Sequence, residues 1–100
     1  MKIPDSVRIG GIDYIISGNL GINDGEHVLY GRISFDKSVI ELNPDVQEYQ
    51  KKCVTLWHEI IHGIIEHANL KLGKKSERIT DTIAKGVYQV LNDNEHKFFG

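Results

Sequence analysis

The sequence has little of what several protein classes require. It holds one cysteine, Cys53, in 100 residues, which excludes an internal disulfide framework and a zinc site built from several cysteines. No apolar run approaches the ~20 residues that a membrane-spanning helix needs. The net charge is −2, without the basic excess that domains gripping nucleic acid usually carry. We therefore expect a protein of a reducing cytoplasm that contacts neither a membrane nor nucleic acid.

What the sequence does contain is typical of one small globular domain. Hydrophobic residues make up 40% of the chain and charged residues 26%, a balance found in folded rather than disordered proteins. A length of 100 residues allows one domain, 1–100, with one modest core. The chain meets Pro4 and Asp5 almost at once, which argues against a signal peptide. A core this small, without disulfides, gains stability from a bound metal.

The first part of the chain, 1–42, predicts a small, mostly antiparallel sheet. Gly10-Gly11 lies between two apolar segments and is a hairpin signal. The glycine-rich stretch 18–25 predicts a surface loop, with a flap over a binding site as the alternative. Apolar segments flanked by turn residues predict the strands, at 7–9, 12–16, 28–35 and 39–42.

The rest of the chain predicts helices, which makes the fold class α+β. Asn43 is a candidate N-cap and Pro44 a candidate first residue for a long helix within 43–70. Ser76 is the candidate N-cap of a second helix, 76–93, whose apolar residues recur at helical spacing. We expect the two helices to pack together and the tail, 94–100, to fray.

The motif with the clearest chemistry is H-E-x-x-H, formed by His58, Glu59 and His62. On a helix, two histidines four residues apart share one face and reach the same ion. Glu59 projects about 100° away from His58, at the edge of that face, where it suits a general base better than a ligand. The surrounding helix is apolar on most of its surface, and burying these groups without partners costs several kcal/mol. A bound cation turns that cost into binding energy.

A catalytic zinc site takes a third protein ligand. Glu77 stands at the start of the second helix and is the leading candidate for this ligand. The alternative is that Glu77 only stabilises the helix, as an acidic residue near the positive end of the helix dipole. His96 in the tail stays open as another ligand. His67 falls on the opposite face of the motif helix, and Cys53 also faces away from both histidines. We expect these two to be a helix-end histidine and a small core residue.

Two further residues share a face with Glu77 on the second helix. Asp81 is four residues on and would orient a ligand imidazole; an ordinary solvated acid is the alternative. Tyr88 would donate a hydrogen bond to a substrate carbonyl or its developing oxyanion, and a half-buried core tyrosine is the alternative.

These residues resemble the zincins, a group of zinc-dependent metallopeptidases. The motif at 58–62 followed by Glu77 and Asp81 looks like the gluzincin arrangement, in which a glutamate on the next helix completes H-E-x-x-H. The metzincin pattern does not fit, because Ile65 and Ala68 stand where it needs glycine and histidine. More specifically, residues 28–94 resemble the short phage and mobile-element relatives of the ImmA/IrrE-type metallopeptidases. That resemblance implies a cytoplasmic enzyme, of a bacterial host if phage-encoded, directed at a repressor or another regulator.

The expected function is therefore hydrolysis of peptide bonds in a protein substrate. One Zn²⁺ per chain would be held by His58, His62 and Glu77, while Glu59 takes a proton from water and passes it to the leaving amine. Strand 39–42 would be a sheet edge that aligns an extended peptide. The alternative is a non-catalytic zinc-binding module that contacts a phage or host protein.

Overall fold

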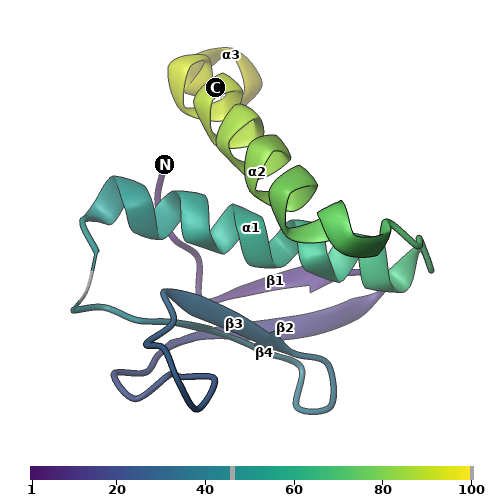
Figure 1. Cartoon of the computed structure of the whole chain (residues 1–100). Helices are drawn as coiled ribbons and strands as arrows, with labels where there is room; N and C mark the ends of the chain where they lie inside the picture. Colours follow the sequence, from purple (N-terminus) through teal and green to yellow (C-terminus); the bar gives the residue numbers. More distant parts are fainter. Residues whose placement is uncertain (46, 100) are drawn as a thin grey trace.

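The computed structural model describes residues 1–45 and 47–99 and has the expected α+β architecture. A four-stranded sheet packs against one face of a long helix, and a second helix crosses the other side of that helix (Figure 1). The elements, in chain order, are β1 (Ser6–Ile9), β2 (Ile12–Gly18), β3 (Gly31–Ser34), β4 (Val39–Leu42), α1 (Tyr49–His67), η1 (Gly73–Lys75), α2 (Ser76–Asp93) and α3 (Glu95–Phe99).

The sheet is mixed, with the strand order β1-β2-β4-β3. The pairs β1–β2 and β3–β4 are antiparallel, as expected, but β2 and β4 run parallel. The long connection after β2 carries the chain past the position of β4 and places β3 at the edge, so β4 then fills the gap between β2 and β3. The prediction that strand 39–42 forms a sheet edge is therefore wrong, and β3 is the edge strand beside α1.

Local turn chemistry accounts for the first hairpin. Gly10 and Gly11 have φ values of 57° and 83°, a conformation that side chains with a Cβ rarely adopt. This confirms the hairpin signal in the sequence. The loop after β2 folds back onto the protein through Ile22, which is fully buried, and a single bridge joins Asn23 to Val28.

The core lies between the sheet and α1. Alternate strand residues point at the helix, and the buried cluster consists of Ile9, Tyr14, Ile40, Leu42, Leu56 and Ile60. Each such aliphatic side chain contributes roughly 1.5–3 kcal/mol through burial. Gly63 lets α1 approach the sheet closely, because a Cβ there would lie 2.9 Å from Ile9 Cδ1. This close packing fixes the height of the motif helix above the strands.

The predicted start of the long helix is wrong by several residues. Helix α1 begins at Tyr49, and the side chain of Glu48, the residue before it, makes no capping hydrogen bond. Asn43 is buried instead and organises the preceding turn: its Oδ1 accepts a hydrogen bond from Asp45 N at 3.2 Å, and its Nδ2 donates to Leu29 O at 3.3 Å. Its short polar side chain thus stabilises a turn rather than a helix end. Residue 46, within the predicted helix, lies outside the described residues.

The second helix has the predicted bounds, 76–93, but not the predicted cap. Ser76 is its first residue and makes no capping bond, because the 3₁₀ turn η1 already leads the chain into the helix. The fraying expected of the tail is not seen in residues 94–99, and residue 100 lies outside the described residues. Asn94 Nδ2 donates to Val90 O at 2.9 Å, and Glu95–Phe99 form the short helix α3. Among the described residues, no helix has the length and apolarity to span a bilayer.

Candidate metal centre

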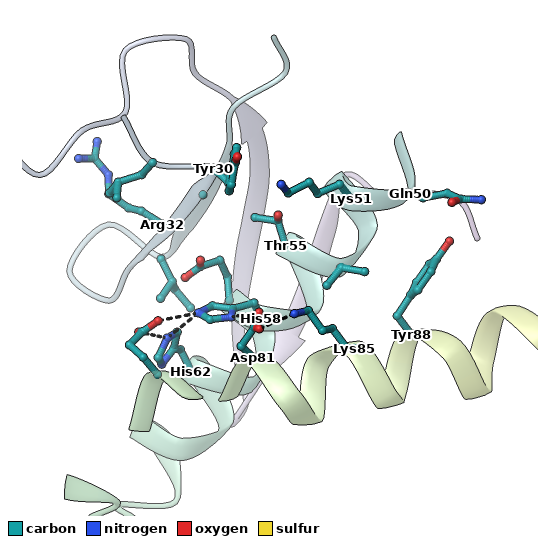
Figure 2. Close-up of a pocket in the computed structure, with 16 residues that line it drawn as sticks. Tyr30, Arg32, Gln50, Lys51, Thr55, His58, His62, Asp81, Lys85 and Tyr88 are labelled. Carbon is teal, nitrogen blue, oxygen red and sulfur yellow. Dashed lines mark hydrogen bonds and ion pairs between the residues drawn. The ribbon is translucent and has the colours of Figure 1, made fainter. Parts of the chain in front are cut away.

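Helices α1 and α2 bring His58, His62 and Glu77 together. The two histidines lie one turn apart on α1 (Figure 2). Glu77 lies in the first turn of α2. His62 Nε2 lies 2.7 Å from Glu77 Oε1, and His58 Nε2 lies 3.1 Å from Glu77 Oε2. The two Nε2 atoms are 3.1 Å apart. One potential ligand atom from each residue therefore falls within 4.8 Å of the others.

This donor set fits a zinc ion. Two imidazole nitrogens and one carboxylate oxygen are ligand types that Zn²⁺ prefers, and three protein ligands leave a fourth coordination position free for water or substrate. The histidines are partly buried and Glu77 is exposed. Among the described residues, this is the one group of three or more potential ligands close enough to share an ion.

Asp81 is positioned to hold the ring of His58. Its Oδ1 lies 3.5 Å from His58 Nδ1, on the side of the ring away from Glu77, and its Oδ2 pairs with Lys85 Nζ at 2.8 Å. The hydrogen bond from Lys85, together with the nearby charges of Lys85 and His58, keeps the pKa of Asp81 below its usual value. A carboxylate on the second ring nitrogen orients an imidazole and favours the tautomer whose Nε2 is free. Asp81 thus lies beside His58, and its role in orienting a ligand imidazole stays a prediction.

Glu59 differs from the other acids because it is buried. Only 7% of its surface is exposed. Burial, with a smaller contribution from the negative charge of Glu77, raises the pKa of Glu59 from 4.5 to about 7. A carboxyl that exchanges its proton near neutral pH, beside the two histidines, is suited to general acid–base chemistry.

These groups line a cleft with a volume of about 970 Å³. Its walls are the edge strand β3 with the two residues before it, the exposed side of α1, and the face of α2 that carries Glu77. The cleft is lined by Leu29, Tyr30, Gly31, Arg32, Ile33, Gln50, Lys51, Val54, Thr55, His58, Glu59, His62, Glu77, Asp81, Lys85 and Tyr88.

Tyr88 lines the cleft but lies far from the cluster. It follows Glu77 by eleven residues, about three helical turns or ~16 Å along α2. Figure 2 shows it at the opposite end of the cleft from His62. Burial is the main cause that raises its pKa. Its contact with a substrate carbonyl stays a prediction that this geometry does not support.

The other histidines and the cysteine lie elsewhere. His67 accepts or donates a hydrogen bond with the Tyr14 hydroxyl at 2.8 Å, at the far end of α1. His96 is on α3 and is not part of the metal-binding cluster. Cys53 is fully buried in the protein, as expected.

Three residues that line the cleft, Lys85, Tyr30 and Lys51, were not predicted as site residues. Lys85 could have been found, because it follows Asp81 by four residues, the spacing of an ion pair on a helix. Tyr30 and Lys51 come from different elements, so only the fold brings them into the same cleft.

Comparisons with known proteins found no matching family model, no matching curated protein and no matching solved structure.

Proposed function

We propose that this protein is a zinc-dependent metallopeptidase that hydrolyses a protein substrate. The observation that supports the proposal is the convergence of His58, His62 and Glu77 on one small volume, with the buried carboxyl of Glu59 next to it. These side chains come from two helices, offer donor types that zinc prefers, and line a cleft that can admit a peptide. The resemblance to gluzincins in the order of these residues agrees with this function.

The residues of the chain divide the work. His58, His62 and Glu77 would hold the ion, and Asp81 would keep the His58 ring turned toward it. A bound zinc ion supplies Lewis acidity, which polarises a carbonyl and makes water easier to deprotonate. Glu59 accepts the proton from the attacking water and returns it to the amine that leaves. Only 7% of its surface is exposed, which limits its contact with bulk water.

The substrate would be an extended stretch of polypeptide. Strand β3 is a sheet edge and, with the residues before it, forms one wall of the cleft, so an incoming strand can pair with its free backbone groups. This assigns to β3 the role that the sequence had suggested for residues 39–42. A regulator of a phage or of its host is the substrate that the family resemblance suggests.

The metal site is tested by zinc analysis of purified full-length variants. We expect one zinc per chain in the wild type and loss of zinc in His58→Ala, His62→Ala and Glu77→Ala. His96→Ala is the matched control, since it removes the histidine that the sequence left open as a ligand, and it should keep its zinc. Retention of stoichiometric zinc in the Glu77 variant would contradict the proposed ligand set.

Catalysis is tested separately with Glu59→Gln. This variant should retain zinc and lose at least ~10²-fold of the hydrolysis of an unfolded-protein panel, because the general base is gone. Glu66→Gln changes an exposed carboxylate on the same helix and should keep full activity. The alternative, a non-catalytic zinc-binding module, predicts that Glu59→Gln leaves every biological effect of the protein intact.

A further inference from the structure

The charges of the cleft are unevenly distributed. Its acidic side chains, Glu59, Glu77 and Asp81, all lie at the end that carries the metal-binding cluster. Of its basic side chains, Arg32 pairs with Glu41 at 2.8 Å and Lys85 pairs with Asp81. Lys51 is the basic residue of this cleft that has no carboxylate within ion-pair distance among the described residues.

Lys51 is held in place by an aromatic ring. Its Nζ lies 4.2 Å from the centre of the Tyr30 ring, and both side chains are exposed to the cleft (Figure 2). The negative face of the ring attracts the ammonium group without neutralising its charge. A cation that is positioned but still carries its full charge is suited to bind an anionic group of a ligand.

Tyr30 is itself fixed to α1 by a short chain of hydrogen bonds. Its carbonyl accepts from Asn43 N at 2.8 Å and from Gln47 Nε2 at 3.0 Å. The Gln47 Oε1 atom accepts in turn from Thr55 Oγ1 at 2.8 Å. The backbone that carries the ring is therefore tied to the same helix that carries Lys51. Such preorganisation lowers the entropic cost of binding.

The position of Lys51 relates it to the reaction proposed above. It precedes His58 by seven residues on α1, a separation of about 10 Å at 1.5 Å per residue. An extended peptide covers that distance in about three residues. We infer that Lys51 and Tyr30 form a subsite for a carboxylate side chain of the substrate, about three residues from the bond that is cut. This inference depends on the proposed peptidase function and adds that the substrate is an acidic peptide.

Binding to a chain that cannot turn over tests the subsite directly. The probes are ten pairs of fluorescein-labelled decapeptides, blocked at both ends, whose two members differ only by Glu or Gln at one position. Their affinity for full-length Glu59→Gln protein is measured by fluorescence anisotropy. For at least one pair, the Glu peptide should bind about five-fold more tightly than its Gln partner, and this preference should fall as salt is raised.

Variants made in the same background assign the preference to the subsite. Lys51→Gln should abolish it, whereas Lys51→Arg should preserve it because the positive charge stays. Lys52→Gln is the matched control: it removes the same charge from the next residue, which does not line the cleft, and should leave the preference unchanged. Tyr30→Phe keeps the ring and should keep the preference, while Tyr30→Leu removes the ring and should weaken the preference.

Several outcomes would overturn the inference. It fails if no pair shows a preference, or if the preference survives in Lys51→Gln. It also fails if the same peptides, made with an unblocked C-terminal carboxylate, bind in a Lys51-dependent way while the blocked pairs show no preference, because the group recognised is then the chain end. Hydrolysis of peptides by wild-type protein without any Glu preference contradicts the subsite alone. A Lys51-dependent preference in binding, with no zinc-dependent hydrolysis, contradicts the peptidase function and leaves the subsite standing.

Discussion

The buried carboxyl of Glu59 should make the metal-free fold less stable as the pH rises. In the folded chain burial raises the pKa of Glu59 from 4.5 to about 7, so the folded state holds a proton that the unfolded state has already released. The contribution of this proton is complete below pH 4.5. It is lost as the pH rises through about 7, since ionisation then places a charge in an apolar site. Glu59→Gln removes that charge and should abolish the loss.

The size of the effect follows from the two pKa values. The interval between 4.5 and about 7 corresponds to about 3 kcal/mol in the free energy of unfolding, fully expressed above pH 8. This is a large share of the stability of a small domain. With a chelator present, Glu59→Gln should therefore be more stable than wild type by about 3 kcal/mol at pH 8.5. The difference between the two proteins should shrink steadily toward pH 4.5.

Urea denaturation of the full-length chain in chelator, at steps between pH 4.5 and 8.5, measures this directly. The difference between variant and wild type isolates Glu59, because the other titrating groups are common to both. Glu66→Gln, at an exposed position of the same helix, should show no such pH-dependent difference. If the stability of Glu59→Gln relative to wild type is the same at pH 5 and pH 8.5, the folded chain does not desolvate this carboxyl and the reasoning is refuted.

Three further predictions concern the scaffold around the site. Leu56 is fully buried between α1 and the sheet, so Leu56→Ala should lower the free energy of unfolding in urea by about 2–5 kcal/mol. The Thr80 hydroxyl is buried and has no hydrogen-bond partner within 1–45 and 47–99, so Thr80→Val should raise the melting temperature, at a gain of about 1 kcal/mol. Hydrogen bonds from Asn19 and then from Arg32 lower the pKa of Glu41. The stability that this carboxylate contributes is therefore present above pH 4.5 and lost as the pH falls through its folded pKa. Glu41→Gln should flatten the acid limb of the stability profile, and a limb as steep as that of wild type would contradict the assignment.

The features that sequence reasoning recovered are encoded locally. The spacing of His58 and His62 defines one face of a helix whatever the rest of the chain does. Gly10-Gly11 carries its own turn geometry, with positive φ at both residues. Glu77 was found because it stands in the first turn of a helix whose apolar stripe was already clear. Each of these signals needs only a few neighbouring residues.

The features that were missed depend on contacts between distant parts of the chain. The short apolar segment 39–42 predicts a strand, but its sequence does not indicate whether that strand pairs on one side or on both. Asn43 is a residue type that often caps helices. Its side chain instead makes hydrogen bonds with Asp45 and with Leu29, and Leu29 belongs to a distant segment of the chain. The distance of Tyr88 from Glu77, eleven residues along one helix, follows from the sequence. The crossing angle of α2 over α1, which decides how far this end of α2 lies from His58 and His62, does not.

The structure places two acidic side chains, Glu59 and Glu77, close together, and a bound cation is the simplest explanation because it would offset their negative charge. The carboxyl of Glu59 is buried, and the negative charge of Glu77 raises its pKa further. The metal-free chain thus carries a cost that a hydrophobic residue at position 59 would remove. A cation held by His58, His62 and Glu77 would offset the negative charge next to it. A ligand at 1,000 times its Kd stabilises a fold by about 4 kcal/mol, enough to outweigh the cost estimated for Glu59. On the proposed function, zinc is therefore part of what holds this small domain together as well as part of its chemistry.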